Sequence, residues 1–207
     1  MNVPIEPESQ STQMPLEFTS EHESLKILGF WAFLATDFLL FSSLFAVYAV
    51  YQFRVGMSGP TPAQLFHLGP VIFETVALLT SSFTCGLAVY EMRHHRLKGT
   101  IIWLAVTIVL GAAFVATEIN EFLGDIALHD TWHRSAFLSS FFTLVGTHGS
   151  HVTFGIIWAL TLLIQLAGRG LTQVTTRKVY MFALYWHFLD IIWVFIFTVV
   201  YLSGKIL

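Results

Sequence analysis

Five long apolar stretches dominate this sequence and limit what it can fold into. They run from about 27 to 53, 70 to 92, 99 to 123, 135 to 168 and 179 to 203. Each exceeds the roughly 20 residues with which an α-helix crosses the hydrocarbon core of a bilayer. All six prolines lie at or before Pro70, so none interrupts a stretch. The sequence therefore predicts an all-α integral membrane protein, a bundle of five transmembrane helices.

The composition supports this class and excludes several others. Hydrophobic residues make up 55% of the chain and charged residues 11%, less than half of the roughly 25% that is usual in soluble domains. The single cysteine, Cys85, rules out a disulfide scaffold. A net charge of -3 with ten Lys and Arg and no basic block argues against a nucleic-acid partner.

The charges outside the stretches predict the domain organisation and the orientation. Residues 1–24 are acidic and lack Lys and Arg, so we expect a solvated tail before a single membrane domain at 25–207. Five crossings place the basic residues on two sides. The side of the tail holds Lys26, Arg93, Arg96, Lys98, Arg169, Arg177 and Lys178, and the other side holds Arg54, Arg134 and Lys205. Because cytoplasmic loops carry the excess of Lys and Arg, we predict a cytoplasmic N-terminus and an outside C-terminus.

Ionisable residues inside the stretches are the informative ones, because a charged group at a helix centre costs about 2.5–3.5 kcal/mol in a membrane. In chain order they are Asp37, Glu74, Glu118, Glu121, His148, His151, His187 and Asp190. Six of them form pairs three residues apart, a spacing that shares a helix face. A rise of about 1.5 Å per residue predicts two polar layers. Asp37, His151, His187 and Asp190 fall near the middle of the membrane, and the three glutamates lie nearer the outside.

The residues by themselves leave several interpretations of these layers open. A metal or bis-histidine haem site at His148 and His151 is one, since imidazole is a common ligand. A proton relay is another, although no continuous chain of groups crosses the membrane. A stand-alone ion-coupled transporter is a third, without broken helices or an internal repeat to support it. The residues favour a fourth: buried acids and histidines satisfy one another and hold the helices in register.

Four segments resemble subunit III of the haem-copper respiratory oxidases. They are GFWAFL at 29–34, EINEF at 118–122, GTHGSHV at 146–152 and LYWHFLDIIW at 184–193. The resemblance keeps the order and spacing of the family motifs from about residue 25 onward. The last segment, W-H-F-x-D-x-x-W inside a membrane span, is the most specific.

This resemblance implies a companion subunit and not a reaction centre. In the family, subunit III carries no haem or copper; these lie in the catalytic subunit I, which reduces dioxygen to water and pumps protons. Subunit III stabilises subunit I, supports proton uptake and assembles with subunits II and IV in the cell membrane. Five helices resemble the shorter form typical of bacterial quinol oxidases, which some bacterial cytochrome c oxidases share. Gln165 and SFTCG at 82–86 favour a quinol, menaquinol or ubiquinol, as the electron donor.

The resemblance also implies a phospholipid site. Asp37 aligns with an acid, and His151 with the second histidine of the H-x-x-H motif that His148 begins; the acid and the second histidine contact a lipid head group in seven-helix relatives. The family's arginine aligns with Gln165, a departure that weakens the expectation of a tightly held anionic lipid. The remaining polar residues are expected to pack between helices: Glu74, Glu118, Glu121, His187 and Asp190. No catalytic, cofactor or metal residue is expected in this chain.

Overall fold

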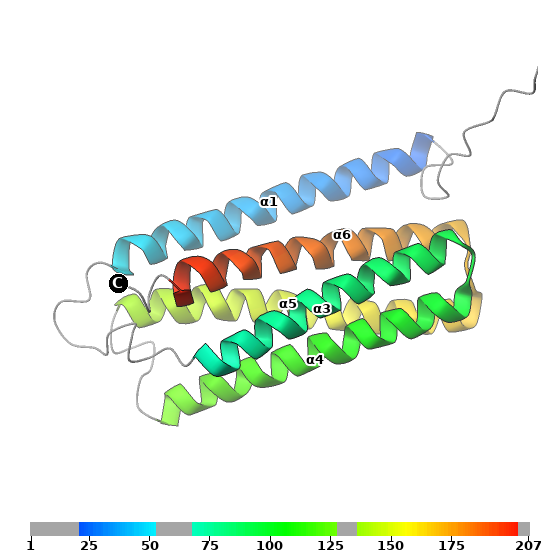
Figure 1. Ribbon diagram of the computed structural model, residues 1–207. Coiled ribbons are helices and arrows are strands. Elements are labelled where there is room, and N and C mark those ends of the chain that lie inside the picture. The colour runs from blue at the N-terminus through cyan, green and yellow to red at the C-terminus, as the bar shows by residue number, and fades with distance from the viewer. Residues whose placement is uncertain (1–20, 53–67, 128–135, 203–207) are drawn as a thin grey trace, which may run out of the picture.

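The computed structural model describes residues 21–52, 68–127 and 136–202 (Figure 1). These residues form α1 (Glu21–Gln52), α3 (Leu68–Arg93), α4 (Leu97–Ala127), α5 (Ala136–Arg169) and α6 (Gln173–Ile196), which the π-helix η2 (Phe197–Leu202) continues. Five spans are long and apolar enough to cross a membrane. The prediction of an all-helical membrane protein with five transmembrane helices is confirmed. Residues 1–20 of the expected tail lie outside the described residues, and its last four residues belong to α1.

The connection between α5 and α6 shows how local chemistry ends one helix and begins the next. Gly170 has a φ of 67°, which glycine adopts without strain, and its N–H donates to the carbonyl of Leu166 at 2.9 Å. Thr172 then caps α6. Its hydroxyl accepts the N–H of Thr175 at 3.2 Å, and the Thr175 hydroxyl accepts the N–H of Thr172 at 2.7 Å. These bonds satisfy backbone groups that the helix ends leave unpaired.

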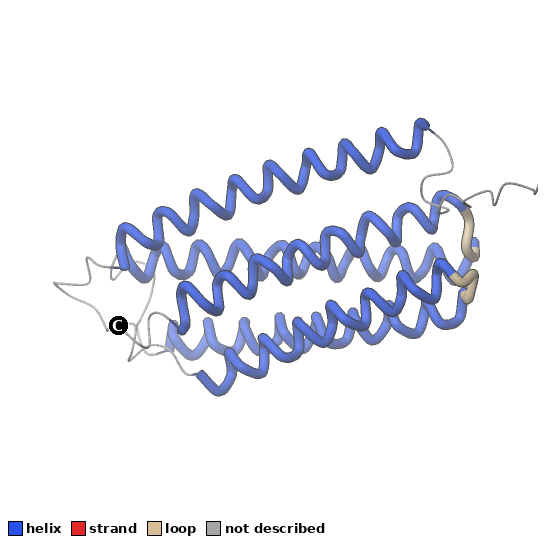
Figure 2. The backbone as a smooth tube through the Cα atoms, turned by 45° about the horizontal axis from the view of Figure 1, so that its top comes forward, coloured by secondary structure: helices blue, strands red, loops and turns tan. Residues whose placement is uncertain are grey.

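α6 lies at the centre of the bundle. It packs on α5 and α3 and touches α1 more lightly, while α4 packs against α3 and α5. Helices that follow one another in the chain run in opposite directions, so α1 and α6 run in the same direction, with α1 at one edge of the bundle and α4 at the other (Figures 1 and 2). The most apolar window of α6 is 50% buried, against 22% for α1. α1 is therefore the least covered of the five spans.

Two tryptophans fasten α6 to α3. Trp186 Nε1 donates to Ser81 Oγ at 3.0 Å, and Trp193 Nε1 donates to Thr75 Oγ1 at 3.1 Å. Both indole side chains are almost fully buried. A buried indole N–H requires an acceptor, so these two bonds set the position of α6 along α3.

Two glycines make room for Trp186. A Cβ on Gly111 of α4 would lie 2.7 Å from the ring, and one on Gly155 of α5 would lie 2.9 Å from it. Such approaches are too short for carbon atoms in a close-packed interior. The large ring therefore contacts α3, α4 and α5 together, and its fit depends on the missing side chains at these two positions.

Candidate functional site

Asp37 and His151 link α1 to α5 near the middle of both spans. His151 Nε2 lies 3.4 Å from Asp37 Oδ1, and the Nδ1 of the same ring donates to the carbonyl of Thr147 at 2.7 Å. The hydroxyl of Tyr185 on α6 donates to the backbone carbonyl of His151 at 3.0 Å. The second oxygen of Asp37 is buried without a hydrogen-bond partner among the described residues. The structure thus brings together two residues that the sequence placed at one depth.

The ring of His148 bonds to a different helix from the ring of His151. It is completely buried, and its Nε2 donates to the carbonyl of Leu189 on α6 at 3.2 Å. Its ring lies between Phe114, at 5.7 Å between centroids, and Trp193, at 5.2 Å. The two histidines of the H-x-x-H motif therefore connect α5 to two different helices, His148 to α6 and His151 to α1.

Ser82, His187 and Asp190 form a polar group between α3 and α6. Ser82 Oγ lies 2.7 Å from His187 Nδ1, and the Asp190 carboxyl lies near the same hydroxyl, with one of its oxygens buried and without a hydrogen-bond partner among the described residues. His187 and Asp190 are both only partly buried. The sequence paired these two residues by their spacing but gave no sign that Ser82 of α3 bonds to His187.

The three glutamates gather between α3 and α4, close to α5. Glu74 and Glu118 are 1% and 5% exposed, and one oxygen of each lacks a hydrogen-bond partner among the described residues. Glu121 lies close enough to both for the charges to interact. A Cβ on Gly149 of α5 would collide with the Glu118 carboxyl, so the glycine makes room for this acid. Within the described segments, no group of three or more His, Cys, Asp or Glu side chains is arranged to hold a metal ion.

A basic cavity lies where α1 begins, α5 ends and α6 begins. Its volume is about 370 Å³, and its lining includes Lys26, Gln165, Arg177 and Lys178. Lys178 Nζ donates to Gln165 Oε1 at 2.8 Å. The sequence pointed to Gln165 but gave no sign that cations surround it, because only the turn at 170–172 brings Lys178 back beside α5.

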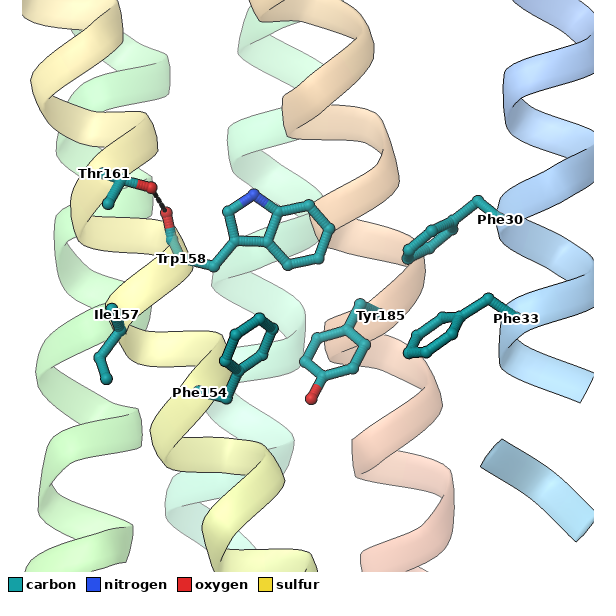
Figure 3. Close-up of a pocket in the computed structure, with 7 residues that line it drawn as sticks. All are labelled: Phe30, Phe33, Phe154, Ile157, Trp158, Thr161 and Tyr185. Carbon is teal, nitrogen blue, oxygen red and sulfur yellow. Dashed lines mark hydrogen bonds between the residues drawn. The ribbon is translucent and has the colours of Figure 1, made fainter. Parts of the chain in front are cut away.

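An aromatic groove adjoins this cavity. Phe30 and Phe33 of α1, Phe154 and Trp158 of α5, and Tyr185 of α6 line a space of about 500 Å³ (Figure 3). Trp158 lines both spaces, so the groove begins where the basic cavity ends. The far end of the groove approaches the Asp37–His151 contact, because Phe33 lies one turn before Asp37, Phe154 follows His151 by three residues, and the Tyr185 hydroxyl bonds to His151.

Comparison with known proteins assigns the family. The family model described as cytochrome c oxidase subunit III matches residues 15–205. The chain belongs to the cytochrome c oxidase subunit III family. This confirms the resemblance seen in the four sequence segments. As a member of this family with five spanning helices, the chain is a multi-pass protein of the bacterial cell membrane.

Similar members of the subunit III family come from Bacillus species. The chain is 51% identical to "Quinol oxidase subunit 3" of Bacillus spizizenii over 95% of this chain and 96% of the relative. It is 50% identical to the Bacillus subtilis protein of the same name, with the same coverage. It is 47% identical to "Cytochrome c oxidase subunit 3" of Bacillus sp. strain PS3 over 87% of each chain.

Proposed function

We propose that this chain is the non-catalytic subunit III of a haem-copper quinol oxidase. Such a complex couples quinol oxidation and the reduction of dioxygen to water with proton pumping. The observation that carries the proposal is the identity of about half of all aligned residues to two Bacillus quinol oxidase subunits over nearly their whole lengths. In this proposal the haems and copper belong to subunit I, and the chain assembles with subunits I, II and IV.

The second candidate is subunit III of a cytochrome c oxidase. The 47% identity to the Bacillus sp. strain PS3 protein favours it. Both candidates place the redox chemistry in other subunits, so they differ in the electron donor of the complex and not in the chemistry of this chain.

The test is to purify the complex from its native membrane through a tag on this chain. We expect a haem-copper subunit in the preparation, and oxygen uptake driven by a quinol without added cytochrome c. Oxygen uptake that requires reduced cytochrome c would establish the second candidate. A preparation without any haem-copper subunit would overturn both, and a tag on an unrelated membrane protein is the matched control.

The structural role of the chain follows from its polar contacts. Asp37–His151, His148–Leu189 and Trp193–Thr75 each join two different helices. Such interhelical contacts hold a bundle in register in a medium that offers no water. We infer a rigid companion that stabilises subunit I during turnover and supports its proton uptake.

The same proposal places the basic end of the bundle in the cytoplasm. The start of α1 and the described connections α3–α4 and α5–α6 lie at one end (Figure 1). These elements carry the seven Lys and Arg that set the predicted orientation, and an excess of Lys and Arg is typical of cytoplasmic ends. We expect the single-cysteine variants His95→Cys and Leu171→Cys to be labelled by a thiol reagent from the cytoplasmic side only.

A phospholipid is the ligand we propose for the basic cavity and the aromatic groove. Lys26, Arg177 and Lys178 surround the position where family members carry an arginine, and Lys178 bonds directly to Gln165. Lys178 of α6 thus supplies the positive charge that α5 lacks at Gln165. A phosphate group fits the cations, and an acyl chain fits the apolar groove that continues toward Asp37 and His151.

Lipid retention tests this site. We expect Lys178→Met to lower the amount of phosphatidylglycerol that copurifies with the complex, measured by mass spectrometry of the extracted lipid. Lys98→Met, a substitution at the same end of the bundle but on α4, is the matched control and should retain the wild-type amount. Equal lipid in all three preparations would contradict the proposed site.

A further inference from the structure

Several exposed hydroxyl groups on the described helices are satisfied by the backbone of their own helix. Thr36, Ser43, Thr80, Thr161 and Thr198 each donate to a carbonyl three or four residues earlier, at 2.7 Å. A hydroxyl bonded in this way can face lipid, because no donor is left unpaired in the hydrocarbon. These five residues show one way in which a polar side chain can face lipid in this bundle.

His187 does not follow that pattern. It lies in the outward strip of α6, between Leu184 and the 56% exposed Ile191, and is itself only partly buried. Its Nδ1 contacts Ser82 Oγ at 2.7 Å, and this is the only hydrogen bond of the ring within the described part of the chain. Its second nitrogen, Nε2, therefore has no partner there.

The hydrogen bond between Ser82 and His187 leaves the Nε2 of His187 without a partner among the described residues in either tautomer of the ring. The Ser82 hydroxyl either accepts from Nδ1–H or donates to Nδ1. If it accepts from Nδ1–H, Nε2 is left as an acceptor. If it donates to Nδ1, Nε2 carries the proton and is left as a donor.

The depth of His187 excludes a lipid head group as that partner. The residue lies at the middle of the span Gln173–Leu202 and nine residues beyond Lys178, about 13 Å along the helix. Acyl chains offer no hydrogen bonds, and the neighbouring exposed residues Ile191 and Val194 are apolar. Ionisable groups at such depth almost always face protein or a water-filled cavity, and the apolar surroundings favour protein.

The adjoining surface of α3 is shaped for a close helix. Gly86 lies one turn beyond Ser82, is exposed, and has open space where a Cβ would point. Small residues four apart allow the backbones of membrane helices to approach closely. A helix packed over Gly86 would bring its side chains to the edge of α6 that carries His187 and Asp190.

We propose that the α3/α6 face, defined by Ser82, Gly86, His187, Asp190 and Ile191, binds a transmembrane helix of another subunit of the oxidase. That helix presents a hydroxyl or amide side chain to His187 Nε2, because these groups both donate and accept. The inference rests on the proposed function, since the oxidase complex supplies the partner helix.

Photocross-linking in the intact complex tests the face. Ile191 is replaced by photoreactive benzoylphenylalanine, and the matched control is the same replacement at Val109, a 67% exposed residue near the middle of α4. We expect a covalent adduct with another oxidase subunit from position 191 and a several-fold weaker one from position 109. Adducts with lipid alone at 191, or equally strong protein adducts at both positions, would overturn the inference. The haem spectrum of the same preparation separates this failure from a failure of the proposed function.

A pair of variants at His187 tests the hydrogen bond. His187→Gln keeps a group that both donates and accepts, whereas His187→Leu keeps only bulk. We expect His187→Leu to lower retention of the chain in the detergent-purified complex about threefold, the effect of an average interhelical hydrogen bond in a membrane. His187→Gln should retain wild-type amounts. Equal retention of both variants, whether high or low, would contradict the hydrogen bond.

Discussion

α1 and α6 are both long apolar helices, but they are held in the bundle by different means. α6 is clamped by steric fit: Trp186 fills the space left by Gly111 and Gly155, and Trp193 bonds to Thr75. α1 is less than half as buried, and its polar link to the bundle is the contact of Asp37 with His151. Grooves of about 500 Å³ and 410 Å³ lie along it.

The comparison shows two ways of specifying a membrane helix. Packing of large rings into glycine gaps fixes α6 without help from outside the chain. α1 is held by one buried polar pair and by the buried rings of Phe41 and Tyr48, which pack against His151 and Phe137. Much of its surface is left to lipid or to neighbouring subunits. Substitutions should therefore have large effects around α6 and small effects around α1.

The largest effect is expected where α6 fits most tightly. Gly111→Ala places a methyl group about where Trp186 now lies, and overpacking of this kind destabilises by about 1–3 kcal/mol. Denaturant-induced loss of the chain from the purified complex measures it. Gly168→Ala, where open space surrounds the new Cβ, is the matched control; equal midpoints for the two variants would show that the fit around Trp186 is loose.

A smaller effect is expected from removing one hydrogen bond of α6. Trp193→Phe keeps an aromatic ring but loses the N–H that donates to Thr75, which contributes about 1 kcal/mol. The same denaturation measurement applies. The control is Trp31→Phe, which changes a tryptophan that is 52% exposed on α1 and should leave the midpoint unchanged. A shift of the midpoint in both variants would show that the smaller ring, and not the lost hydrogen bond, causes the effect.

A weaker effect is expected at the link of α1. Asp37→Ala removes the partner of His151, and polar contacts between membrane helices average about 0.6 kcal/mol. The complex should lose activity sooner during turnover while its initial rate of oxygen reduction stays normal, because the chemistry belongs to another subunit. Loss of the initial rate with normal haem content would refute that division of labour.

The smallest effect is expected at Thr36, one residue before Asp37. Thr36→Val removes a hydroxyl that bonds to its own helix at the carbonyl of Phe33, and such surface changes usually stay within about 0.5 kcal/mol. Turnover lifetime should equal that of the wild type. A lifetime as short as that of Asp37→Ala would show that this side of α1 contacts protein and not lipid.

The helices could be predicted from the sequence because their signals are local. Backbone groups in hydrocarbon must bond within the helix, so uninterrupted apolar stretches are sufficient to identify the spans. The W-H-F-x-D-x-x-W segment was specific enough to indicate the family that the comparisons confirmed. Counting residues along their helices placed Asp37 and His151 at one height, and the structure brings the two side chains into contact.

Side-chain partners could be predicted only in part. Spacing placed His148 and His151 near one face but could not show that one ring bonds to α6 and the other contacts α1. Gln165 was read as the loss of a cation, whereas the fold brings Lys178 to its side. Trp186 and Trp193 fell within a motif, yet nothing in the motif indicated that Ser81 and Thr75 accept their N–H groups.

The sequence by itself determined that the chain has five membrane helices, at what height along each helix its polar residues lie, and which family it resembles. The first two properties depend on composition and on distance along the helix axis, and the third depends on short motifs; all three can be read from one helix at a time. Only the tertiary structure decided which polar group meets which, that Lys178 lies beside Gln165, and which face of α6 carries a hydrogen-bonding group without a partner among the described residues. Those properties depend on the rotation of each helix against its neighbours, and that rotation is set by contacts such as the fit of Trp186 between Gly111 and Gly155.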